Sequence, residues 1–153
     1  ASLLYYTSNE NDEQIRTIAF TKIKACKNHE DELIRIMEDG NPYSVFSFLE
    51  ENKVEKPERF VEPLIKSFPM IIADMREEIE SERGSGAIDL GPILGTLEGQ
   101  FIGSLPMFKP YIVKLQEAME ASPAKSRLYH DPEKCREKLQ KNREEIKDWL
   151  ARH

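Results

Sequence analysis

Glycine spacing constrains this chain more than any other feature of its sequence. Four of its seven glycines, Gly91, Gly95, Gly99 and Gly103, follow one another at intervals of four residues. The leucines, isoleucines and phenylalanine between them favour a helix, and this spacing would then place all four glycines on one face. Each glycine inside a helix costs about 1 kcal/mol relative to alanine. We therefore expect a close neighbour on this glycine ridge, either another helix of the chain or an external partner or cofactor.

The apolar residues of the first half of the chain also recur at helical intervals. Asn11-Asp12 can cap a helix that stops near Asn28, a shorter helix ends at Gly40, and Pro42 opens a third helix. No segment alternates apolar and polar residues for long enough to predict a strand. The sequence therefore predicts an all-α fold. We expect one domain over residues 1–153, built from about 7–8 helices as a bundle or a short stack of helical hairpins.

A short internal repeat suggests how the middle of the chain is organised. Residues 64–70 (LIKSFPM) return 37 positions later as residues 101–107 (FIGSLPM). A serine followed by proline can start a helix, because the proline lacks an N–H that would be unpaired there. We predict two helical hairpins, which either arise from a duplication or share their turn chemistry. Their helices are residues 57–66 with 68–83 and residues 89–103 with 105–121, joined at Gly84-Ser85-Gly86.

The C-terminal segment, residues 125–153, differs from the rest of the chain in charge. Its net charge is +3, whereas residues 1–124 carry −9. We predict a basic C-terminal helix that begins at Asp131-Pro132 and carries a narrow apolar stripe. The stripe consists of Cys135, Leu139, Ile146, Trp149 and Leu150. It can pack across the domain or pair with another chain, and Trp149 can serve as an anchor for the helix or as a binding hot spot.

Residues typical of catalysis and metal binding are sparse. The chain lacks HExxH, Walker and GxSxG motifs, and none of its three histidines has a glutamate three residues before it, as a di-metal bundle would. His29 and Glu32 could hold a metal only with ligands from elsewhere, and we interpret His29 as a capping or solvent-facing residue. We expect no enzyme, no catalytic residue, no metal site and no cofactor.

One short segment resembles part of a known family. Residues 107–114 (MFKPYIVK) are similar to a Met-Phe-x-Pro-x-x-Val-Lys stretch in the helical cap of methionine synthase-type corrinoid proteins, and Gly91-Pro92 is similar to a Gly-Pro in that cap. That family holds its cofactor mainly through an α/β domain and an Asp-x-His-x-x-Gly motif, neither of which is found in this sequence. The resemblance therefore implies a shared helical hairpin and no bound cobalamin.

Composition narrows the remaining function classes. Two cysteines without paired spacing and the lack of a long apolar run indicate a reduced, cytoplasmic protein with no membrane segment. The net charge of −6 disfavours nucleic acid as a partner. We expect a non-enzymatic adaptor or regulatory domain that presents an apolar groove to a partner helix or peptide. The oligomeric state stays open.

Candidate partner-binding residues follow from the ridge and from outlying aromatic side chains. They are Gly91, Gly95, Gly99, Gly103, Phe101, Ile102, Tyr111 and Trp149. The alternative function is that of a small-molecule-binding or sensor bundle, in which the glycine-ridge helix lines a cavity for a flat or apolar ligand.

Overall fold

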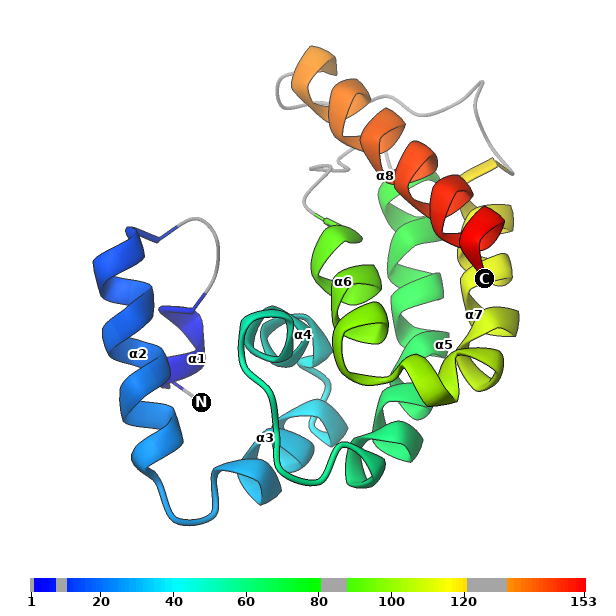
Figure 1. Cartoon of the computed structure of the whole chain (residues 1–153). Helices are drawn as coiled ribbons and strands as arrows, with labels where there is room; N and C mark the ends of the chain where they lie inside the picture. The colour runs from blue at the N-terminus through cyan, green and yellow to red at the C-terminus, as the bar shows by residue number, and fades with distance from the viewer. Residues whose placement is uncertain (1, 8–10, 81–87, 121–131) are drawn as a thin grey trace.

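The computed structural model describes residues 2–7, 11–80, 88–120 and 132–153 (Figure 1). Its helices are α1 (Ser2–Tyr5), α2 (Glu13–Ala25), α3 (His29–Glu38), α4 (Pro42–Glu51), α5 (Glu58–Glu80), α6 (Gly91–Gln100), the 3-10 helix η1 (Ile102–Ser104), α7 (Leu105–Glu120) and α8 (Pro132–Arg152). No strand occurs in these ranges, and the helices pack into a compact bundle. The predicted all-α fold is confirmed. The predicted Gly84-Ser85-Gly86 joint, the Asp131 cap and the Cys135 side chain lie outside what the structure describes.

The first three predicted helices appear where their local signals place them. The Asp12 carboxylate accepts a hydrogen bond from the backbone N–H of Gln14 at 2.8 Å, which caps α2. Gly40 follows α3 with a φ of +95°, a conformation that glycine adopts without steric cost. Pro42 occupies the first turn of α4.

Helix α5 differs from the predicted hairpin. The chain does not turn at Ser67-Phe68-Pro69 but continues as one helix through both Pro63 and Pro69. A proline inside a helix removes one backbone hydrogen bond and clashes with the preceding turn. A continuous buried stripe opposes that cost, and it comprises Phe60, Leu64, Phe68, Ile71, Met75 and Ile79. The repeated segments thus have different conformations, because residues 101–107 do form a corner between helices.

Aromatic side chains join the central helices. The Phe68 ring on α5 lies 6.2 Å from that of Phe46 on α4 and 6.1 Å from that of Phe108 on α7, measured between centroids. Phe101 extends this cluster from the end of α6, 6.0 Å from Phe108. Edge and tilted arrangements at these distances are favourable for aromatic pairs. One core therefore unites α4, α5, α6 and α7.

Helix α8 covers one end of this core (Figure 1). Ile146 and Trp149 are fully buried, so the apolar stripe does pack across the domain. The buried Asn142 side chain accepts a hydrogen bond from the N–H of Leu90 at 3.1 Å and donates one to the carbonyl of Ile88 at 2.9 Å. These bonds tie α8 to the start of α6, where the helix has unpaired backbone N–H groups.

Helices α1 and α2 form the opposite edge of the molecule (Figure 1). Of α2, only Ala19 and Ile23 are buried. Phe20 packs edge-on against Phe48 of α4 at 5.7 Å, and Arg16 forms an ion pair with Glu51. This edge therefore attaches through α1, which packs on α4, and through one narrow face of α2, whose other face remains exposed.

Replacing Trp149 with alanine tests the docking of α8. We expect Trp149→Ala to lower the free energy of unfolding by about 3–5 kcal/mol, because the substitution empties a fully buried position. Lys147→Ala on the exposed face of the same helix is the control and should change it by less than about 0.5 kcal/mol. Urea denaturation of both variants provides the measurement. Equal stabilities would contradict the packing of α8.

Candidate functional site

The glycine ridge does not lie on one helix. Gly91, Gly95 and Gly99 belong to α6, which ends at Gln100, whereas Gly103 lies in η1. Phe101 separates the two elements with φ −118° and ψ 26°, outside the helical region. The predicted continuous helix over residues 89–103 is therefore wrong in its last turn.

The surroundings of the four glycines differ as well. A Cβ on Gly95 would lie 3.1 Å from Oε1 of Glu50, and one on Gly91 would lie 3.1 Å from Oδ1 of Asp89. A Cβ on Gly99 or Gly103 would meet nothing within 4 Å. No backbone of another helix approaches the ridge among these nearest atoms, so the expected tight helix packing on all four glycines is wrong. Carboxylate side chains face the first two glycines, and solvent faces the last two.

Polar side chains of α6, not its glycines, carry its closest contacts with α4. The Thr96 hydroxyl donates to the carbonyl of Phe46 at 3.0 Å. The Gln100 amide donates to the carbonyls of Leu49 at 2.5 Å and Asn52 at 2.8 Å, and its oxygen accepts from the N–H of Val54 at 2.9 Å. The two bonds donated by Gln100 satisfy carbonyl groups at the C-terminal end of α4 that the helix itself leaves unpaired, and the Thr96 bond adds a contact to the middle of α4. Sequence reasoning overlooked both residues.

The N-terminal half of the ridge borders an acidic cavity of about 300 Å³. Its lining comprises Glu50, Gly91, Leu94, Gly95, Glu98, Glu145, Asp148 and Arg152. Burial opposes the ionisation of Glu98, but hydrogen bonds from Arg152 and His153 outweigh this effect and lower its pKa. Four carboxylates and one guanidinium do not provide the apolar walls that a flat, apolar ligand requires. Among the described residues, no three metal-binding side chains converge in a geometry that could hold an ion.

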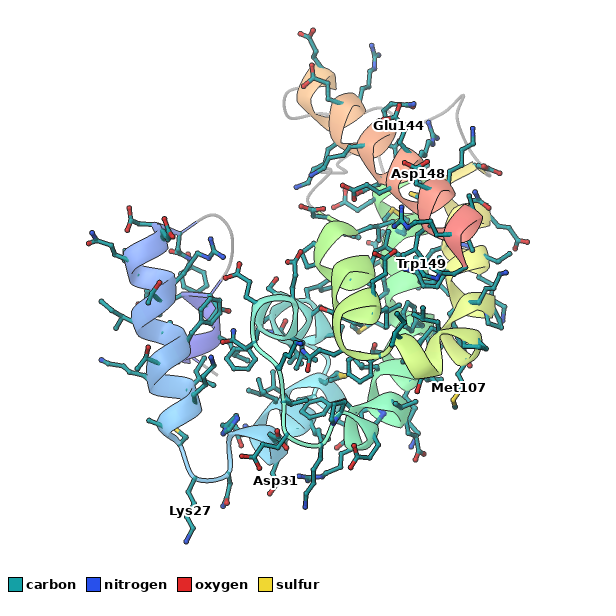
Figure 2. All side chains as sticks on the ribbon, in the orientation of Figure 1. Lys27, Asp31, Met107, Glu144, Asp148 and Trp149 are labelled. Carbon is teal, nitrogen blue, oxygen red and sulfur yellow. The ribbon has the colours of Figure 1, made fainter. Side chains whose placement is uncertain are left out.

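The predicted aromatic contact residues lie mostly inside the protein. Trp149 and Phe101 are buried, and Tyr111 is half-buried with its ring stacked on that of Phe68 at 5.6 Å. Ile102 alone among the predicted apolar side chains is exposed, at 70%. Ile102 lies in η1. Five residues later, at the start of α7, the Met107 side chain is 54% exposed and projects into solvent in Figure 2.

An apolar groove lies instead where α1, α2 and α3 meet. Its volume is about 330 Å³. The lining residues are Leu3, Leu4, Ile23, Cys26, Asn28, His29, Glu32, Leu33 and Ile36. The thiol of Cys26 is free and exposed, and Nδ1 of His29 lies 3.1 Å from the carbonyl of Cys26. We call this cavity the α1–α3 groove. Sequence reasoning used the apolar residues of this region only as evidence for helices and did not detect the groove.

Exposed apolar side chains lie on or directly after α1 and on α2. Among the described residues, four of the six large apolar side chains that are exposed belong to this region: Tyr5, Tyr6, Ile15 and Ile18. Ile15, Ile18, Lys22 and Cys26 recur at helical spacing and therefore share one face of α2. That face continues to the groove, since Cys26 lines it. The groove and the exposed apolar side chains of α1 and α2 together form the candidate contact site.

Comparisons of the chain with protein-family models, with curated proteins and with solved structures found no match. None of the described helices combines the length and the apolar character needed to cross a membrane.

Two glycine substitutions separate the open part of the ridge from the part next to Glu50. Gly99→Ala should raise the free energy of unfolding by about 0.5–1 kcal/mol, because it favours the helix and contacts nothing. Gly95→Leu should lower it by about 1–3 kcal/mol, since the larger side chain must displace Glu50. Thermal or urea unfolding measures both. The opposite order of stabilities would show that the contact lies at Gly99.

The Glu50 carboxyl should make stability depend on pH. Partial burial of the Glu50 side chain raises its pKa, and the charges of Asp89 and Glu145 raise it further, while those of Arg16 and Lys141 act in the opposite direction. The folded-state pKa thus lies above the unfolded value of 4.5. As the pH rises from 4.5 through the folded-state pKa, ionisation of Glu50 lowers the free energy of unfolding. Protonation of Glu50 at lower pH restores that stability.

Replacing Glu50 with glutamine tests this relation. Glu50→Gln should be more stable than the unaltered protein at pH 7, and the difference should shrink below about pH 4.5. Glu144→Gln, on the exposed face of α8, is the control and should show no such trend. Urea unfolding at the two pH values measures the effect. A Glu50→Gln variant that is less stable at neutral pH would contradict the assigned environment.

Proposed function

We propose that this protein is a non-enzymatic helical interaction domain whose α1–α3 groove receives the apolar face of a partner helix. The observation that carries the proposal is an apolar groove formed with α1 and α2, the same two helices that bear the exposed Tyr5, Ile15 and Ile18 side chains. Helices that bind in grooves insert residues at i, i+3, i+4 and i+7 into such cavities. A volume of about 330 Å³ is sufficient for several inserted apolar side chains.

The attachment of α1 and α2 supports this assignment. Their main contacts are with each other, with α3 and with α4, at the edge of the bundle. Elements with few buried apolar contacts adjust more readily to a ligand than elements of the core. Ile18 is 56% exposed and Tyr5 is 73% exposed, so a partner would remove substantial apolar surface from water without displacing any part of the domain.

The alternative function, small-molecule binding in a cavity lined by the glycine-ridge helix, has less support. The cavity beside Gly91 and Gly95 is acidic, whereas the expected ligand is flat or apolar. The exposed corner around Gly99, Ile102, Gly103 and Met107 offers a second surface for a protein partner, whereas the α1–α3 groove adds a concave apolar cavity of about 330 Å³. We therefore assign the partner helix to the α1–α3 groove.

A synthetic amphipathic helix with leucines on one face and glutamines on its flanks provides the direct test. We expect it to bind the protein and to protect the Cys26 thiol from maleimide, because Cys26 lines the groove. Peptide mapping by mass spectrometry distinguishes Cys26 from Cys135. Binding should weaken about tenfold or more in Ile18→Asp, which adds a charge to the exposed face of α2.

Met107→Asp is the matched control, since Met107 is exposed to nearly the same extent as Ile18 but lies on α7. It should leave peptide binding unchanged. If Met107→Asp weakens binding and Ile18→Asp does not, the partner contacts the corner between α6 and α7. If the peptide neither binds nor protects Cys26, the proposed helix-in-groove function is wrong.

A further inference from the structure

The C-terminal end of α2 provides the positive charge next to the groove. Lys22, Lys24 and Lys27 are exposed, and none of them forms an ion pair within the part of the chain that the structure describes. Lys22 lies one turn before Cys26, whose thiol donates to the Lys22 carbonyl at 3.4 Å. Lys27 lies between two groove residues, Cys26 and Asn28, and projects from the α2–α3 connection in Figure 2. Lys22 and Lys24 flank Ile23, another groove residue, so all three lysines are immediate sequence neighbours of residues that line the groove.

The acidic residues on the other side of the groove are already paired. The Arg35 guanidinium donates to Glu32 at 3.0 Å from Nε and to Asp39 at 2.6 Å. Its hydrogen bond with Glu32 lowers the pKa of that carboxyl. Arg59 forms an ion pair with Asp31.

The third acidic residue of this turn is also satisfied. Glu30 accepts a hydrogen bond from the N–H of Glu55 at 2.7 Å, and its carboxylate lies 3.8 Å from the Arg59 guanidinium. The first turn of α3 therefore presents little uncompensated negative charge. The lysines at the end of α2 and in the α2–α3 connection are the charges near this groove that a partner can still neutralise.

We propose that the partner of the α1–α3 groove is an acidic amphipathic helix, whose apolar face enters the groove and whose carboxylates lie next to Lys22, Lys24 and Lys27. This inference rests on the proposed function and names its partner class. The chain as a whole carries a net charge of −6, so an acidic partner is repelled by most of the surface. Complementary charge at one site then restricts such a partner to the groove.

An acidic helix fits this site better than a membrane surface does. Lysines next to exposed tyrosines and isoleucines would also attract anionic lipid. The groove is concave, however, and its buried walls include Leu4, Ile23 and Leu33, so it accommodates inserted side chains and not a flat bilayer. The acidic remainder of the chain further opposes adsorption to an anionic membrane.

Two synthetic helices with the same leucine face test the proposal, one with glutamates on its flanks and one with lysines. At about 50 mM salt the glutamate peptide should bind at least about tenfold more tightly than the lysine peptide. The preference should largely vanish near 500 mM salt, since the contributing charges are exposed. Maleimide protection of Cys26 reports whether each peptide occupies the groove.

Charge reversal on the protein provides the complementary measurement. The triple variant Lys22→Glu, Lys24→Glu and Lys27→Glu should lose the preference for the glutamate peptide or reverse it. The control replaces Lys114, Arg136 and Lys147 with glutamate, which changes the net charge equally on α7 and α8. It should keep the preference, and circular dichroism should show that both variants remain folded.

The outcomes separate this inference from the function on which it depends. If both peptides protect Cys26 with equal affinity, the groove binds helices and the assigned partner charge is wrong. If neither peptide binds, the proposed function fails. If the protein binds phosphatidylcholine vesicles that contain about 30% phosphatidylserine but neither peptide, a lipid surface replaces the acidic helix as the partner.

Discussion

The aromatic contacts of Phe68 determine how the rest of this structure is arranged. Its ring lies against Phe46, Phe108 and Tyr111, so one residue of α5 positions α4 and α7 on either side. These contacts also stabilise α5 as one helix next to Pro69, because a turn there would remove Phe68 from the core. The position of α6 follows, since Phe101 reaches the same cluster and Thr96 bonds to the backbone of Phe46.

Local signals in the sequence were sufficient to predict most of the helices. Asp12, Gly40 and Pro42 act through their own backbone neighbours, and their effect does not depend on distant residues. The uninterrupted course of α5 could not be predicted in this way. Pro63 and Pro69 favour a break locally, and the opposing stabilisation comes from aromatic residues that lie far away in sequence. Tertiary packing therefore overrode local propensity at this point.

The candidate site was predictable only in part, for a related reason. The four-residue spacing indicated a shared face for four glycines. What that face contacts depends on where α6 ends and on side chains of α4 and α8. The α1–α3 groove has no sequence signature. In the sequence Leu3, Ile23 and Leu33 are indistinguishable from ordinary core residues, and only the packing of three helices leaves a cavity beside them. A cavity is a property of packing, and periodicity describes only one helix at a time.

The position of the groove follows from how burial is distributed along the chain. The stripe on α5 and the residues of α8 around Trp149 bury their apolar side chains almost completely. Helix α2 buries only Ala19 and Ile23, so its remaining isoleucines face solvent. The exposed Ile15 and Ile18 do not stabilise the isolated domain. They leave apolar surface at the edge of the bundle, on a helix with few buried residues. A partner can bind there without disturbing the Phe68 cluster, and this separation of core from edge is why variants of α2 can probe binding independently of folding.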